Sequence, residues 1–137
     1  MAVISAEMKP DSIVFDLDGT LWDTTPACAV AWNTVLARHG IPYREIVPED
    51  VRRVTGRPHA ECLRVTFADL PSDQVDLLVE GTATEDNLEI ARMGGELFEG
   101  VVDGLRRLRE SYPLFIVSNC QAGYIENFLS LSGLQDV

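Results

Sequence analysis

Two short apolar runs flank a long stretch in which apolar and polar residues follow helical spacing. Residues 12–17 read S-I-V-F-D-L, and residues 113–117 read P-L-F-I-V. Continuous apolar runs of this length, closed by turn residues, are typical of strands that a parallel sheet buries on both faces. The pattern therefore predicts two buried strands that lie far apart in the sequence.

Around the second strand and between the two runs, apolar residues recur three or four positions apart, which predicts helices. Capping and breaking residues suggest their limits. Thr24 or Thr25 begins the first helix, Gly40 ends it, and Gly81 is a candidate interruption of a later one. The expected helices cover residues 25–39, a short stretch from 48, 58–69, 72–91, 101–110 and 122–131.

The order of elements is strand, a block of helices, helix, strand, helix. Parallel strands need a crossover connection, so this order describes a βαβ unit with extra helices inserted in its crossover. The expected fold class is α/β, with an incomplete Rossmann-like parallel sheet and an inserted all-helical domain. Residues 1–23 and 95–137 form the expected α/β core, and residues 24–94 the helical insertion.

Composition narrows the possible partners and the compartment. The net charge is −11, and Lys9 is the only lysine. This balance argues against nucleic acid, which is bound through clustered basic residues. No run is long enough to span a membrane, and Met1 to Met8 show no secretory signal. The three cysteines are far apart and form no C-x-x-C pair, so a reducing, cytoplasmic location is expected.

Two carboxylates follow the first predicted strand. Asp16 and Asp18 are two residues apart, so in extended backbone their side chains leave the same face. Open α/β sheets bind ligands at this end of their strands. Paired carboxylates repel each other unless a cation lies nearby, and Mg²⁺ prefers hard oxygen ligands. Gly19 permits a sharp turn whose amides can face an anion.

Ser118 and Asn119 follow the second predicted strand. If the two strands are parallel neighbours, both residues lie beside the Asp pair. The hydroxyl of Ser118 and the amide of Asn119 could then hold a phosphoryl oxygen.

The string D-L-D-G-T-L at 16–21, followed by S-N at 118–119, resembles the haloacid dehalogenase superfamily. The helical block resembles the cap domain of its phosphoglycolate phosphatase and β-phosphoglucomutase members. The resemblance implies Mg²⁺-dependent hydrolysis of a small phosphorylated metabolite. Asp16 would be the nucleophile that forms an aspartyl-phosphate, and Asp18 the general acid and base. Asp16 and Asp18, the latter through its backbone carbonyl, would bind Mg²⁺. Gly19 and Thr20 would contact the substrate.

Arg57 stands in the sequence T-G-R-P between two predicted helices of the insertion. In caps of this type the corresponding loop often reaches over the substrate, so Arg57 is a candidate substrate ligand. A solvated loop arginine is an equally good interpretation.

The family pattern has two further parts, a lysine on a later strand and an acidic pair that completes the Mg²⁺ site. Neither follows Asn119. The chain alone is therefore expected to be inactive or nearly so, and a truncated non-catalytic binding module or a phosphomutase fragment is the alternative. The sheet is expected to expose its edges, which could drive self-association. One side of Ile13, Phe15, Phe115 and Val117 is expected to lack cover.

Overall fold

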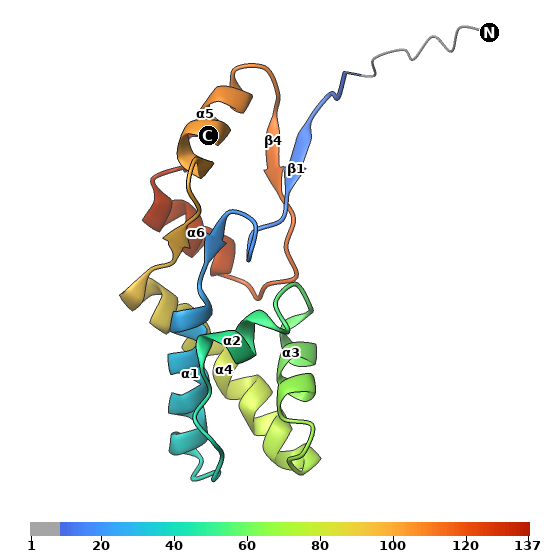
Figure 1. Ribbon diagram of the computed structural model, residues 1–137, viewed down its shortest axis with the longest axis vertical. Helices are drawn as coiled ribbons and strands as arrows, with labels where there is room; N and C mark the ends of the chain where they lie inside the picture. The colour runs from blue at the N-terminus through green and yellow to red at the C-terminus, as the bar shows by residue number, and fades with distance from the viewer. Residues whose placement is uncertain (1–8) are drawn as a thin grey trace, which may run out of the picture.

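The computed structural model describes residues 9–137. Two expectations, the absence of a secretory signal and the start of the α/β core at residue 1, concern residues 1–8, which lie outside the described residues. Two parts are visible in Figure 1, a block of helices and an α/β part that holds the strands. The elements in chain order are β1 (Ile13–Phe15), β2 (Trp22–Asp23), α1 (Thr25–Arg38), α2 (Pro48–Arg52), α3 (His59–Thr66), α4 (Ser72–Met93), β3 (Glu96–Leu97), α5 (Val101–Arg109), β4 (Leu114–Ile116) and α6 (Tyr124–Ser132).

The two predicted strands pair as expected. β1 and β4 are parallel neighbours, with Val14 opposite Phe115. This confirms the α/β fold class and brings the carboxyl ends of both strands to the same edge. Both strands are shorter than the apolar runs that predicted them, although Pro113 and Val117 still exchange backbone hydrogen bonds with β1.

The register corrects the expected set of uncovered side chains. In a strand, alternate residues face opposite sides, so the pairing groups Val14 with Phe115 and Val117 on one face. Val14, Phe115 and Val117 are 57%, 54% and 66% exposed. Ile13 and Phe15 share the other face and are half-buried. The uncovered face was expected, but Val14 belongs to it in place of Ile13 and Phe15.

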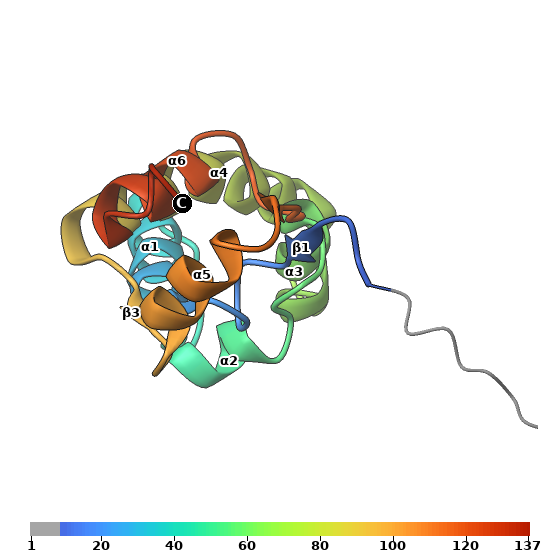
Figure 2. The same cartoon turned by 90° about the horizontal axis from the view of Figure 1, so that it is seen from above.

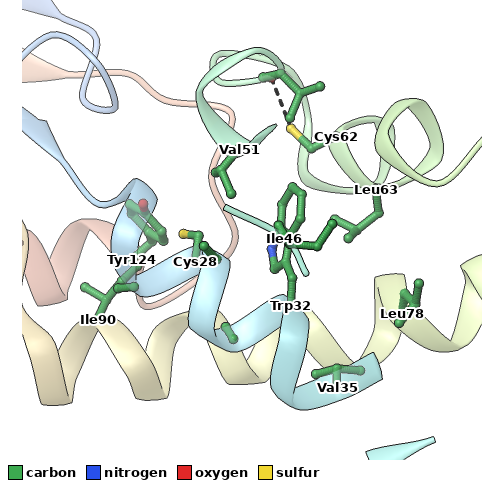
Figure 3. Close-up of a cluster of buried hydrophobic side chains, with 14 of the residues drawn as sticks. Cys28, Trp32, Val35, Ile46, Val51, Cys62, Leu63, Leu78, Ile90 and Tyr124 are labelled. Carbon is green, nitrogen blue, oxygen red and sulfur yellow. Dashed lines mark hydrogen bonds between the residues drawn. The ribbon is translucent and has the colours of Figure 1, made fainter. Parts of the chain in front are cut away.

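The helical insertion, α1 to α4, is built on a long crossing between α1 and α4. Its core includes Val35, Leu63, Phe67, Leu78 and Ile90, none of which is exposed to solvent. Figure 3 shows part of this core, where Trp32 and Val35 of α1 face side chains from the other helices. Among residues 9–137 no helix combines the length and the apolar character that crossing a membrane requires.

Gly81 does not interrupt a helix, which corrects the sequence expectation. α4 runs unbroken from Ser72 to Met93. A Cβ atom at position 81 would lie 2.6 Å from Cγ1 of Val35. Glycine is therefore present because α1 and α4 approach closely there, and the packing offsets its low helix propensity.

A short antiparallel pair of strands, which the hydrophobic pattern did not predict, closes the insertion. Trp22 pairs with Leu97, and Asp23 with Glu96. The segment that leads into α1 and the segment that follows α4 therefore lie side by side. Figure 2 shows α6 lying next to α4, so the α/β part contacts the insertion at a second place.

Candidate active site

The turn after β1 presents two carboxylates. Leu17, which lies between them in sequence, is completely buried and anchors the turn in the core. Asp16 is exposed and Asp18 is half-buried. Gly19 has a φ of +74°, a left-handed conformation that residues with a Cβ rarely adopt. The turn folds the chain back, so that the amide of Gly19 donates to the carbonyl of Trp22 at 3.0 Å.

Three side chains surround one oxygen of the Asp18 carboxyl. Oδ1 accepts hydrogen bonds from the hydroxyl of Tyr124 at 2.8 Å, the indole N–H of Trp22 at 3.2 Å and the hydroxyl of Thr24 at 3.4 Å. The hydroxyls of Thr24 and Tyr124 lie 2.6 Å apart. The second carboxylate of the pair is therefore held in one orientation by groups from β2, from the residue that precedes α1 and from α6.

The surroundings of Asp18 favour its protonated form. Burial raises the pKa of this carboxyl, the hydrogen bonds from Tyr124, Trp22 and Thr24 lower it, and the nearby charge of Asp16 raises it again. The net direction is upward, which favours the form of the carboxyl that carries a proton. Burial and the charges of Cys28 and Asp18 also raise the pKa of Tyr124, so this phenol stays protonated and acts as a donor.

The parallel pairing brings Ser118 and Asn119 to the same edge as the Asp pair. The side-chain amide of Asn119 donates to the carbonyl of Gly56 at 3.0 Å. Gly56 belongs to the loop between α2 and α3, so this bond joins the end of β4 to the helical insertion.

These residues border a cavity of about 490 Å³, a size suited to a small metabolite. Six of the seven predicted site residues line it: Asp16, Asp18, Gly19, Arg57, Ser118 and Asn119. Thr20 does not line it and is exposed. The cavity lies between the two parts of the molecule, since the insertion supplies much of its wall.

Two arginines line the cavity, and both are paired with acids. The Arg57 guanidinium donates to Glu61 at 2.8 Å and is about half exposed. Arg52 pairs with Glu49 at 2.7 Å and with Asp23 at 3.1 Å. An arriving phosphate or carboxylate would have to share these guanidinium groups with their present partners.

Mg²⁺ suits the donors at the end of β1. Asp16 offers an exposed carboxylate, and the backbone carbonyls of the turn are further hard oxygen donors. Mg²⁺ commonly takes one or two carboxylates and fills its remaining positions with water and substrate phosphate. Within residues 9–137, no cluster of three or more His, Cys, Asp or Glu side chains could enclose an ion. The donors thus form an open, partial site.

Sequence reasoning missed several residues of the cavity wall. Tyr124 opens α6 and is 106 residues from Asp18, its hydrogen-bond partner. Asp86 lies within α4 and is almost completely buried, although its local sequence is that of an exposed helix face. Two others, Thr24 and Arg52, resemble an ordinary helix cap and a surface arginine. Their places in the cavity wall depend on contacts with residues far away in the sequence, Tyr124 for Thr24 and Asp23 for Arg52.

The model of the haloacid dehalogenase-like hydrolases matches residues 13–137. The validoxylamine A 7'-phosphate phosphatase of Streptomyces hygroscopicus subsp. limoneus is 31% identical over 121 residues, which are 88% of this chain and 55% of that protein. The phosphoglycolate phosphatase of Caulobacter vibrioides is 34% identical over 117 residues, 81% of this chain and 47% of that protein. The chain spans about half the length of the curated relatives it matches.

Solved structures share the fold. A hydrolase from Pseudomonas syringae superposes with a TM-score of 0.69 at 23% identity, covering 92% of this chain and 57% of the other. A haloacid dehalogenase-like family protein from Streptococcus pneumoniae has a TM-score of 0.67 at 25% identity, covering 92% and 56%.

Proposed function

Because this chain belongs to the haloacid dehalogenase-like hydrolases, we propose that its site serves the Mg²⁺-dependent hydrolysis of small phosphate monoesters through an aspartyl-phosphate. The relatives named above are phosphatases. The observation that carries the proposal is the different surroundings of the two carboxylates. Asp16 is exposed to the cavity, whereas Asp18 is held by Tyr124, Trp22 and Thr24.

The first half of the reaction uses both carboxylates. An oxygen of Asp16 attacks phosphorus, and the bond from phosphorus to the ester oxygen breaks. Asp18, whose pKa is raised chiefly by burial, donates its proton to that leaving oxygen. The products of this half are the free alcohol and a phosphorylated Asp16.

The second half returns the enzyme to its starting state. Asp18, now ionised, takes a proton from a water molecule while that water attacks phosphorus. The bond from phosphorus to the oxygen of Asp16 breaks, and inorganic phosphate leaves. Tyr124 keeps Asp18 oriented in both halves, since its phenol donates to the same carboxyl oxygen.

Mg²⁺ would be held by the carboxylate of Asp16 and the backbone carbonyl of Asp18, and would supply positive charge beside the phosphoryl oxygens. In this proposal Asp18 binds Mg²⁺ through its backbone carbonyl and not through its side chain. In support, one oxygen of the Asp18 carboxyl already accepts the hydrogen bond from Tyr124. Ser118 and Asn119 are proposed to hold the phosphoryl group from the other strand end.

Phosphoryl transfer depends on cationic support for the transferring group, and losing one such donor costs on the order of 10²–10³ in rate. The arginines that line the cavity are shared with Glu61, Glu49 and Asp23, and the chain has one lysine, Lys9, at its start. We therefore expect the 137-residue chain alone to turn over phosphate esters very slowly.

The test is an assay of the protein at its natural length with Mg²⁺ and para-nitrophenyl phosphate. Asp16→Asn should remove nearly all turnover and Asp18→Asn most of it, while Asp11→Asn, an exposed acid outside the cavity, should change little. Removing Mg²⁺ with a chelator should abolish the rate reversibly. Full activity of the Asp16→Asn variant would overturn the proposal.

The relatives differ in the ester that their names state. One is named for fructose 1-phosphate, three for phosphoglycolate and one for validoxylamine A 7'-phosphate. The family therefore supports a small phosphate ester, and the choice of alcohol must come from the cavity wall.

A further inference from the structure

The indole ring of Trp22 is buried next to the Asp18 carboxyl, and the mechanism above gives it no part. Trp22 is 1% exposed. Its ring packs edge to face against the ring of Tyr124, with ring centres 6.0 Å apart, and against that of Phe128 at 5.1 Å. Trp22 belongs to β2, whereas Tyr124 and Phe128 belong to α6. Segments about 100 residues apart thus form one packed aromatic cluster beside the acid.

Gly95, in the segment between α4 and β3, lies against the indole ring. A Cβ atom at position 95 would lie 2.8 Å from Cδ2 of Trp22 and 2.9 Å from Cγ2 of Thr24, both too close for a side chain. The indole cannot move aside without losing its packing against Phe128, because both rings are almost completely buried. Only glycine therefore leaves the indole in its place.

The hydrogen bonds from the cluster converge on one oxygen of Asp18. Oδ1 lies 2.8 Å from the hydroxyl of Tyr124 and 3.2 Å from the indole nitrogen of Trp22. The hydroxyl of Thr24 is more distant, at 3.4 Å, and lies nearer to Tyr124, at 2.6 Å. An indole N–H can only donate, so Oδ1 must offer Trp22 a lone pair whether or not the carboxyl carries a proton. A proton on Oδ1 would compete with these donors, and Oδ2 is therefore the atom that carries it.

The second oxygen of Asp18 is open. Among the described residues, the hydrogen bonds to this carboxyl all go to Oδ1. Oδ2 is not one of the buried oxygens that lack a partner, so it is accessible from the cavity that Asp18 lines. Asp16, the proposed nucleophile, lines the same cavity. The oxygen of Asp18 that can meet the ester is thus Oδ2.

We propose that Trp22 is a positioning residue for the proton transfer: together with Tyr124 it occupies Oδ1 of Asp18 and leaves Oδ2 to exchange the proton with the substrate. Gly95 keeps the indole in place. The inference rests on the proposed function of the same site. In the first half of the reaction the bond from Oδ2 to its proton breaks, and the proton joins the leaving ester oxygen. In the second half Oδ2 takes a proton from the attacking water. A carboxyl that could turn freely would spend less time in the productive orientation.

Two esters that differ in their need for a proton test the role of Trp22. The alkoxide of ethyl phosphate is strongly basic and needs a proton to leave, whereas the phenolate of 2,4-dinitrophenyl phosphate leaves without one. In the protein at its natural length with Mg²⁺, Trp22→Phe and Tyr124→Phe should each lower kcat/KM for ethyl phosphate about tenfold more than for the dinitrophenyl ester. A purely structural role would reduce the amount of folded enzyme and leave the ratio of the two values unchanged.

Gly95→Ala tests the same role without removing any hydrogen-bonding atom. It should displace the indole and lower the ratio by a similar factor. Gly104→Ala is its matched control, because a Cβ atom there meets no atom within 4 Å. Tyr112→Phe, which removes a phenol outside the cavity, is the control for the hydroxyl. Both controls should keep the wild-type ratio. Melting temperatures show which variants fold, and folded Trp22→Phe or Gly95→Ala variants with the wild-type ratio would overturn the inference.

An NMR measurement separates this inference from the proposed function, since it needs no turnover. The indole N–H signal of Trp22, assigned with the Trp22→Phe variant, should move upfield in Asp18→Ala, which removes the acceptor, and in Gly95→Ala. The signal of Trp32, whose indole is not bonded to Asp18, is the reference. If no phosphate ester is hydrolysed, the proposed function fails, and the NMR result still decides whether Trp22 holds the carboxyl. An unmoved Trp22 signal in an active protein would overturn the positioning role alone.

Discussion

The helical insertion and the two-stranded parallel sheet differ in how completely they bury their apolar side chains. In the insertion, Leu63, Leu78 and Ile90 are wholly buried. On one face of the sheet, Phe115 and Val117 are more than half exposed. Burying a large apolar side chain contributes about 1.5–3 kcal/mol, so the sheet face forgoes stabilisation that the insertion obtains. The insertion thus buries its apolar side chains in the core of the molecule, whereas this face of the sheet has no cover among residues 9–137.

The largest expected difference in the free energy of unfolding comes from truncating one large apolar side chain in each part to alanine. Leu78→Ala should lower the free energy of unfolding by about 2–5 kcal/mol, because it leaves a cavity where α4 meets the other helices. Phe115→Ala should cost less than about 0.5 kcal/mol, because the ring is 54% exposed already. Urea unfolding of the dilute chain, followed by circular dichroism, measures both.

Equal costs for the two truncations would contradict the comparison and show that the sheet face is covered in solution. Repeating the measurement at several protein concentrations identifies that cover. A cost for Phe115→Ala that grows with concentration indicates a second copy of the chain, which is the self-association expected from the exposed sheet edges.

Glycine to alanine substitutions should have opposite signs in the two parts. Gly81→Ala places a Cβ atom 2.6 Å from Cγ1 of Val35. Val35 is β-branched and wholly buried, so it cannot rotate away, and we expect a loss of about 1–2 kcal/mol after the gain in helix propensity. Gly104→Ala in α5 meets no atom within 4 Å and should stabilise the chain by about 0.5–1 kcal/mol. A stabilising Gly81→Ala would show that α1 and α4 are further apart in solution.

Gly81 also illustrates how far the sequence predicts the fold. The apolar runs predicted β1, β4 and their parallel pairing, since continuous hydrophobicity depends on the strand alone. A glycine within a helical pattern has two meanings, a break or a close helix crossing, and only the position of Val35 distinguishes them. The pair β2 and β3 has two residues on each side, too few to show a period.

In the candidate site, too, residues with a local sequence pattern could be predicted, whereas residues placed by distant contacts could not. Asp16 and Asp18 could be predicted because their spacing and their place after a strand are local properties. The contact from Tyr124 to Asp18 joins residues 106 positions apart, and an aromatic residue at the start of a helix has no distinctive pattern. Glu85 and Asp86 are adjacent acids on a helix, and only the crossing of α1 decides that one faces Arg38 and the other the cavity.

The smallest expected difference in stability between the two parts comes from removing one carboxylate in each, Asp50 in the insertion and Asp16 at the end of β1. Asp50 in the insertion accepts two hydrogen bonds from Arg44, at 2.7 and 2.8 Å, and one from the amide of Val47. The Arg44 guanidinium and the Val47 amide lower the pKa of Asp50 to about 2. A lowered pKa means that the stabilisation is complete above pH 3.8, the ordinary value, and is lost as the pH falls toward 2.

Asp50→Asn should therefore cost about 1 kcal/mol at pH 6, allowing for the exposed side chain of Arg44, and the difference from wild type should shrink toward zero near pH 2. Asp16→Asn should not destabilise the chain. The negative charge of Asp16 repels the ionised carboxylate of Asp18, and the substitution removes this repulsion. We expect it to leave the free energy of unfolding unchanged or to raise it by a few tenths of a kcal/mol at pH 6. Urea unfolding of both variants and wild type at the two pH values tests this. A loss for Asp16→Asn as large as that for Asp50→Asn would mean that Asp16 is stabilised by the fold, and its proposed role as a free nucleophile would have to be abandoned.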